Sequence, residues 1–139
     1  MRIKQVEITL KPKSRGFHII TDEILDSIDI SVINIGTINL FLKHTSASLS
    51  INECVEPEVR TDMENILNEI CDDKSYYKHT YEGDDDMPAH VKSSLIGVSL
   101  TIPITDGKLN LGTWQGIYLG EHRNYADTRK IVITIIGMN

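Results

Sequence analysis

Hydrophobic residues alternate with polar residues along several short segments, and this period of two predicts β-strands. The first such segment places Val6, Ile8 and Leu10 on one face. Glycine and proline residues punctuate many of the intervals between the segments, as expected of turns. Asp106 and Gly107 separate two of the segments and predict a tight hairpin. We expect further strands at residues 17–20, 36–42, 98–104, 109–111, 117–121 and 131–136.

Other segments carry the period of an α-helix. Residues 57–70 begin with Pro57, which suits a first helical turn, and we expect their apolar stripe to be buried in the core. Shorter helices are expected near residues 21–28 and after Pro88. Many short strands with two or three helices predict an α+β fold, built as a compact antiparallel β-sandwich-like sheet in a single domain of residues 1–139.

The segment from Lys43 to Asn52, KHTSASLSIN, has an unusual face when it is read as a strand. Its odd positions are mostly small or apolar, whereas a histidine and short polar side chains occupy its even positions. Imidazole, hydroxyl and amide groups line sites for small polar ligands or metals. A solvent-facing strand rich in serine explains the pattern equally well. The even positions are His44, Ser46, Ser48, Ser50 and Asn52.

The segment after Pro88 repeats this chemistry at helical spacing. His90, Ser93, Ser94 and Gly97 fall on one face, at positions i, i+3, i+4 and i+7. The first turn of such a helix also offers free N–H groups to an anion. A solvated helix face is the alternative interpretation.

Three histidines lie at junctions between expected elements: His44, His90 and His122. Neutral imidazoles bind zinc or other divalent cations, and they also transfer protons. The spacing of these histidines matches no short zinc motif, so a site made from them would form only on folding. The aspartates at positions 84–86 could hold magnesium, although runs of aspartate in loops are commonly just solvated.

Arginine and tryptophan side chains near the end of the chain are further candidates for ligand contacts. Arg123 or Arg129 could bind a phosphate in bidentate fashion, or either could be a surface charge. Trp114 and Gln115 lie in a glycine-flanked turn, where the indole could stack on a ligand ring or contact the core or another subunit. The chain contains no phosphate-binding glycine loop, dinucleotide fingerprint, zinc-protease motif or serine-hydrolase motif.

The overall composition narrows the classes of partner. A net charge of −6 over 139 residues argues against nucleic-acid binding, which needs a basic surface. No apolar run approaches the length of a membrane span, and the charged, alternating first residues do not resemble a signal peptide. Cys54 and Cys71 lack metal or redox spacing and fit a reduced, cytoplasmic setting.

Four motifs resemble those of the YjbQ-like family and occur in the same order: HTSASLSINE, VRTDMENIL, YEGDDDMPAHVKSSLIG and GTWQGIYLGEHR. The resemblance extends from the SRGFH segment near the start to the final strand. It implies a compact α+β fold rich in antiparallel strands, association as a homotrimer, and a pocket lined by motif residues. Carried over by motif position, the pocket residues are His44, Ser46, Asn52, Asp86, His90, Ser94, Trp114, Gln115, Glu121 and His122.

This family is often labelled a secondary thiamine-phosphate synthase family. The label implies a transferase that joins a pyrimidine diphosphate to a thiazole phosphate and releases pyrophosphate. It also implies a small phosphorylated partner and a role for magnesium, while the histidines leave zinc open as the divalent cofactor. The pocket motifs contain few cations for a diphosphate, which favours a weak or secondary synthase activity. Metal-assisted hydrolysis and a non-enzymatic trimer that binds a small anion or metal are the alternatives.

Under the hypothesis that the protein is an enzyme, histidines and carboxylates of the motifs are the catalytic residues. His44 and His90 would bind a divalent metal or act as acid and base, and Asp86 or Glu121 would orient one of them. The implied catalytic set is therefore His44, His90, Asp86 and Glu121, and the candidate metal ligands are His44, His90 and His122.

Overall fold

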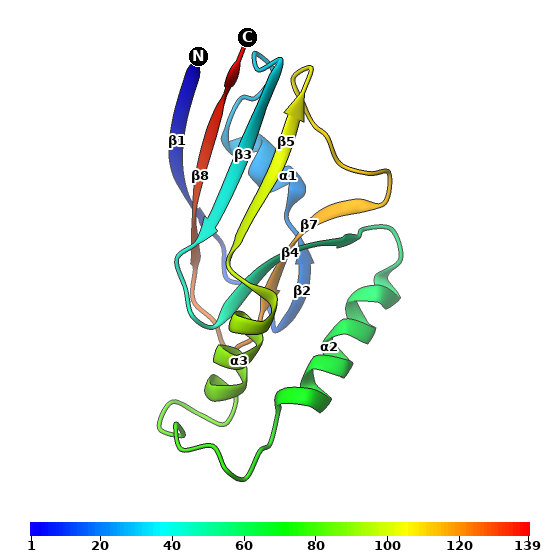
Figure 1. Ribbon diagram of the computed structural model, residues 1–139. Coiled ribbons are helices and arrows are strands. Elements are labelled where there is room, and N and C mark those ends of the chain that lie inside the picture. Colours follow the sequence, from blue (N-terminus) through cyan, green and yellow to red (C-terminus); the bar gives the residue numbers. More distant parts are fainter.

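Eight strands divide between two antiparallel sheets in the computed structural model, which describes all 139 residues (Figure 1). The larger sheet has the order β1-β8-β3-β5-β6 and the smaller sheet the order β2-β7-β4. The larger sheet comprises β1 (Arg2–Leu10), β8 (Arg129–Met138), β3 (Ile35–Leu42), β5 (Ser99–Thr105) and β6 (Lys108–Leu109). The smaller sheet comprises β2 (Gly16–Ile19), β7 (Gln115–Glu121) and β4 (Ala47–Glu53).

The hydrophobic core lies between the two sheets. Alternate residues of the longer strands point into it, which confirms the predicted period of two. Asp106 and Gly107 both have positive φ angles and close the predicted hairpin between β5 and β6. The strand residues of the core are largely isoleucine and leucine: Leu10, Ile38, Leu40, Leu42, Leu49, Ile102, Ile104, Ile117, Leu119, Ile131, Ile133 and Ile135.

Three helices complete the α+β domain: α1 (Thr21–Ser27), α2 (Pro57–Cys71) and α3 (Asp86–Ile96). The short α1 buries Ile24 in the core between the sheets. α2 packs on β2 and α3 packs on β4, so both lie on the outer face of the smaller sheet (Figure 1). None of the three helices is long and apolar enough to cross a membrane.

The segment predicted as one strand from Lys43 to Asn52 is instead a chain reversal followed by a strand. β3 ends at Leu42 and β4 begins at Ala47, so His44 lies in the connection between the two sheets. Ser48 and Asn52 do share a face of β4. The helix layer covers this face: Ser48 is fully buried, and the Asn52 amide contacts Met63 of α2.

The expectation that the apolar stripe of α2 lies in the core is wrong, although the bounds of the helix match the prediction closely. Ile66 is 50% exposed and Ile70 is 54% exposed. Cys71 is the only buried residue of the helix. The helix therefore presents much of its hydrophobic side chain surface outward.

The polar side of α2 faces the protein because one fully buried cation and one partly buried cation need partners there. Arg15, just before β2, donates hydrogen bonds to Glu64, Asn68 and Asp72 at distances of 2.7–3.1 Å. The fully buried ammonium of Lys92 on α3 donates to Asn68 at 2.7 Å and lies 3.0 Å from Asp72. Leaving either cation buried without a partner costs more than exposing part of an apolar stripe.

Two adjacent residues of β3 test which face of this strand points into the core. We expect Leu40→Ala to lower the free energy of unfolding by about 2–5 kcal/mol, because Leu40 is fully buried in the core. Phe41 points to the opposite face and is 47% exposed, so Phe41→Ala should cost less than about 1 kcal/mol. Urea unfolding measures both values, and equal losses would contradict the assignment.

Candidate metal centre and adjoining cavity

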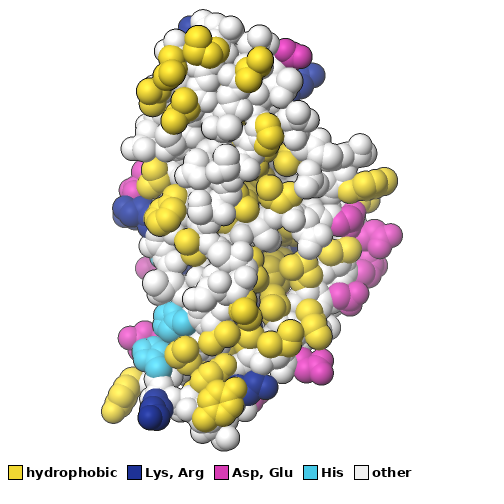
Figure 2. Space-filling view, viewed as in Figure 1, with side chains coloured by type: hydrophobic (Ala, Val, Ile, Leu, Met, Phe, Trp, Pro, Cys, Tyr) yellow, Lys and Arg dark blue, Asp and Glu magenta, His cyan; other side chains and the backbone are white.

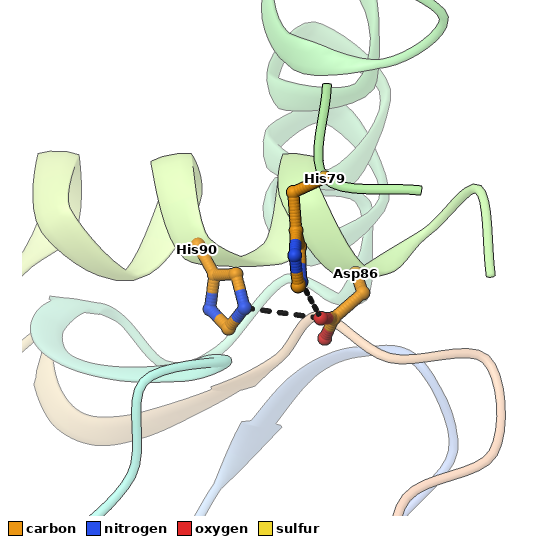
Figure 3. Close-up of side chains that lie close together, drawn as sticks. All are labelled: His79, Asp86 and His90. Carbon is orange, nitrogen blue, oxygen red and sulfur yellow. Dashed lines mark hydrogen bonds and ion pairs between the residues drawn. The ribbon is translucent and has the colours of Figure 1, made fainter. Parts of the chain in front are cut away.

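Two imidazoles and a carboxylate converge at the beginning of α3 (Figure 3). The Oδ2 atom of Asp86 lies 2.6 Å from Nε2 of His79 and 3.0 Å from Nε2 of His90. Asp86 and His90 are one helical turn apart on α3, and His79 comes from the loop between α2 and α3. All three residues can offer ligand atoms that lie within 4.8 Å of one another, and their types are those that bind zinc.

The hydrogen bonds of His90 define which of its nitrogens carries hydrogen. Nδ1 lies 2.7 Å from the carbonyl oxygen of Thr45, which only accepts, so Nδ1 must be the donor. In a neutral ring, the lone pair of Nε2 then points at the Asp86 carboxylate, which is also an acceptor. A second proton on the ring or a cation between the two atoms resolves this conflict. Metal-binding histidines characteristically have their other nitrogen held in this way.

Asp86 is held as an anion at 1% exposure. Its Oδ1 atom accepts a hydrogen bond from Arg123 at 2.6 Å, and Arg123 also donates to Asp85 at 2.9 Å. Burial opposes ionisation of Asp86, but hydrogen bonds from the two histidines and the nearby positive charges outweigh it and hold its pKa below the ordinary value. The centre therefore contains an ionised carboxylate beside two imidazoles.

A cavity of about 790 Å³ adjoins the centre on the His90 side. Its volume is typical of sites for small molecules. The predicted helix face lines it, because His90, Ser93, Ser94 and Gly97 all contribute. The remaining lining residues come from the end of β3, the β3–β4 connection and the start of β5: Phe41, Leu42, Lys43, His44, Thr45 and Val98.

His44 lines the cavity but is not part of the ligand cluster. Its Nε2 atom accepts the backbone N–H of Lys130 at 2.8 Å, so the neutral ring carries its hydrogen on Nδ1. Burial and the charge of Arg129 lower the pKa of His44, which favours this neutral form. With Nε2 occupied, His44 offers an N–H donor in place of the ligand or base predicted from the sequence. The ring also borders a second cavity of about 450 Å³.

His122 is likewise separate from the predicted metal set. The side chain is buried, its Nε2 atom lies 2.8 Å from the Ser48 hydroxyl, and its ring packs edge-on against Phe17. A Cβ at Gly120 would overlap both the hydroxyl and this ring, so the pair depends on that glycine. Burial and the nearby Lys92 ammonium lower the pKa of His122 to about 3, so the ring is neutral.

The carboxylate and guanidinium groups predicted for catalysis and phosphate binding are already paired. Glu121 is fully buried and accepts two hydrogen bonds from Arg129, at 2.6 and 2.7 Å. Arg129 also lies 3.2 Å from the carbonyl oxygen of Ser46. Arg123 makes one ion pair with Asp85 and another with Asp86, so neither guanidinium is free for a phosphate.

Asn52, Trp114 and Gln115 lie away from the centre. β4 and β7 pair so that Glu53 is opposite Gln115, whereas Ala47 is opposite Glu121 at the other end, about 20 Å along the sheet. The Gln115 amide oxygen accepts the backbone N–H of Gly112, and Trp114 is largely exposed. The structure therefore does not bring these three motif residues together with His90.

The acidic run at 84–86 does not form one magnesium site, because its carboxylates have different partners. Asp85 binds Arg123 and the backbone N–H of Asn124, Asp86 binds the histidine pair and Arg123, and Asp84 is exposed. The structure instead adds His79, which sequence reasoning missed. The sequence did contain a signal for the other two residues of the cluster, namely the i, i+4 spacing of Asp86 and His90. The sequence prediction began the helix after Pro88 and so left Asp86 outside it, whereas α3 begins two residues before Pro88, which fits within the first turn.

Comparisons with known proteins agree with the fold and motifs. A family model described as UPF0047 protein YjbQ-like matches residues 6–138. An Escherichia coli O157:H7 protein described as UPF0047 protein YjbQ is 51% identical over 134 residues, covering 96% of this chain and 97% of that protein. A solved Sulfolobus solfataricus P2 structure, described as a YbjQ-like protein of unknown function, is 26% identical with a TM-score of 0.87 and 99% coverage of both chains. A Clostridium acetobutylicum structure described as a conserved YjbQ/UPF0047 protein is 38% identical with a TM-score of 0.83, covering 94% and 99% of the two chains.

The low pKa of His122 predicts a loss of stability in acid. The unfolded chain binds a proton at His122 below about pH 6.5, whereas the folded protein does so only near pH 3. Stability should therefore fall as the pH falls between these values, by about 1.4 kcal/mol per pH unit from this group. Urea unfolding between pH 7 and 4 should show a shallower pH dependence in His122→Gln than in the natural sequence. Equal slopes would contradict a neutral, buried imidazole.

Proposed function

This chain belongs to the UPF0047 YjbQ-like family, and we propose that it is a divalent-metal-dependent hydrolase with His79, Asp86 and His90 as the ligands. The observation that supports the proposal most is the acceptor-to-acceptor contact between His90 Nε2 and Asp86 Oδ2. A cation between these atoms satisfies both. Three protein ligands leave at least one coordination position open, as in catalytic rather than structural zinc sites.

The ligand types favour zinc or a similar transition metal over magnesium. Imidazole suits zinc, whereas magnesium prefers oxygen ligands and retains several waters. A divalent cation at this centre would supply an activated water and polarise a substrate oxygen. In hydrolysis, the water oxygen bonds to the reacting centre of the substrate, the bond to the leaving group breaks, and the leaving group takes a proton derived from that water.

Residues of the chain prepare the centre for this reaction. The Thr45 carbonyl holds the Nδ1–H of His90 and thereby directs Nε2 toward Asp86. Arg123 donates a hydrogen bond to Oδ1 of Asp86, which leaves Oδ2 as the ligand atom. The adjoining cavity would hold the substrate next to His90.

The thiamine-phosphate synthase reaction implied by the resemblance is the second candidate. Its support is the label that the resembled family often carries, and the same centre could carry a metal that contacts a diphosphate. Its requirement for additional cations is poorly met, because Arg123 and Arg129 are both bound by carboxylates. Hydrolysis needs no such cations, and we rank it first for this reason.

We expect the natural sequence to bind one Zn²⁺ per chain in isothermal titration calorimetry. His79→Ala should weaken this binding at least about tenfold, because it removes one of three ligands. His79 lies in a loop and its ring bonds no residue other than Asp86, so the fold should survive. His18→Ala is the matched control, because His18 lies on β2, its ring bonds the backbone carbonyl of Ser14, and its loss should leave the zinc affinity unchanged. Equal affinity in all three proteins would contradict the proposed centre.

Activity assays then separate the two candidate reactions. Zinc-loaded protein should hydrolyse a small activated ester, such as p-nitrophenyl acetate, faster than protein treated with a chelator. The His79→Ala variant should lose this difference. If the ester is untouched and thiamine phosphate instead forms from the pyrimidine diphosphate and thiazole phosphate with magnesium, hydrolysis is the wrong reaction and the synthase is the right one.

We also propose that the protein functions as a homotrimer, as the resemblance implies, with the exposed stripe of α2 in the subunit contacts. Hydrophobic side chains gather over the part of the surface formed by α2 and α3 (Figure 2). Ile66 and Ile70 of α2 are about half exposed. A helix that exposes its apolar stripe in the monomer gains free energy when a partner covers it.

Substitutions on α2 test this assembly. We expect the natural sequence to be trimeric in multi-angle light scattering, and the double substitution Ile66→Asp with Ile70→Asp to be monomeric, because charges would replace buried apolar contacts. Val32→Asp, an exposed position between α1 and β3, should remain trimeric. A monomeric natural protein, or a trimeric double variant, would rule out this surface.

A further inference from the structure

We infer that the 790 Å³ cavity binds the apolar part of a small, uncharged ester or amide, and that His44 donates its Nδ1–H to this substrate. The inference rests on the proposed metal-dependent hydrolysis and names the substrate class for that same site. Three features of the cavity support it: its scarcity of free positive charge, its apolar wall, and the fixed tautomer of His44.

Most of the positive charges near the cavity are paired with carboxylates, although the Lys43 pair is exposed to solvent. Arg123 and Arg129 are bound by carboxylates, and the Lys43 ammonium lies 2.8 Å from Glu7. Lys130 is without such a partner, but it borders the second cavity, not this one. Phosphate and diphosphate sites characteristically present free arginine or lysine side chains. The cavity therefore suits a substrate whose reacting group is an uncharged carbonyl.

One wall of the cavity is apolar. Phe41, Leu42 and Val98 line it, and Phe41 offers most of the apolar surface, because it is 47% exposed whereas Leu42 is 1% exposed. An aromatic ring that is half exposed beside a cavity can pack against a ligand and bury apolar surface on both molecules. His90 lines the same cavity, so a ligand that packs on this wall lies close to the metal centre.

His44 is the candidate hydrogen-bond donor to a substrate in this cavity. The backbone N–H of Lys130 occupies Nε2, and no protein group bonds Nδ1, so the neutral ring keeps a free N–H, and His44 is one of the residues that line the cavity. A donor fixed before the substrate arrives stabilises developing negative charge on a carbonyl oxygen without reorganisation. In this reading His44 touches the substrate, and it neither binds the metal nor accepts a proton.

Hydroxamates test the inference, because their metal-binding group is constant while the attached body varies. In titrations of zinc-loaded protein, benzohydroxamate should bind at least about tenfold more tightly than acetohydroxamate, since its phenyl ring can pack on the apolar wall. Phe41→Ala should reduce this ratio to less than about threefold, while the affinities for zinc and acetohydroxamate stay within about twofold. His44→Leu should weaken both hydroxamates several-fold, and His44→Gln, which keeps a donor, should restore much of the loss.

The experiment distinguishes a wrong substrate class from a wrong metal centre. If zinc binds but the two hydroxamates have equal affinities, or if Phe41→Ala leaves their ratio unchanged, the inferred substrate class is wrong while the metal centre stands. If inorganic pyrophosphate binds the zinc-loaded protein more tightly than benzohydroxamate, the site is built for a diphosphate and the inference is overturned. If the natural sequence binds no zinc, both proposals fail together.

Discussion

The buried carboxylate of Asp86 connects the parts of the chain that form the candidate site. It lies in the first turn of α3, faces His79 from the preceding loop, and accepts from Arg123 beyond the end of β7. Through His90 it is also linked to Thr45 in the β3–β4 connection. An ionised carboxylate at this depth must be compensated, and the groups that compensate it are those that could share it with a metal.

Most of the fold could be predicted from the sequence because it depends on local periodicity. The alternation of Ile38, Leu40 and Leu42 with other residues predicts β3. The sequence Asp106-Gly107 predicts the hairpin, and both residues have the positive φ angles that such a turn requires. The orientation of α2 could not be predicted in this way. Its polar residues face inward because Lys92 lies beneath them, and this neighbour is known only once the chain has folded.

The candidate site was predicted in part, for a related reason. The helix face of His90, Ser93 and Ser94 does line a cavity, because helical spacing alone places these residues together. His79 has no periodic signal, and its role depends on where a long loop returns to α3. In the sequence, Arg123 and Arg129 look like free cations, but folding pairs both with carboxylates. Because the paired arginines are not available to bind a diphosphate, we propose an uncharged substrate instead.

The central claim is that His79, Asp86 and His90 hold a divalent metal. It is tested most directly by anomalous diffraction at the zinc absorption edge, on crystals of the natural sequence grown with Zn²⁺. The account predicts one strong anomalous peak about 2.0–2.2 Å from Nε2 of both histidines and from Asp86 Oδ2. Zinc bound elsewhere, with His90 still in direct contact with Asp86, would contradict the account and would leave the cluster as an ion pair.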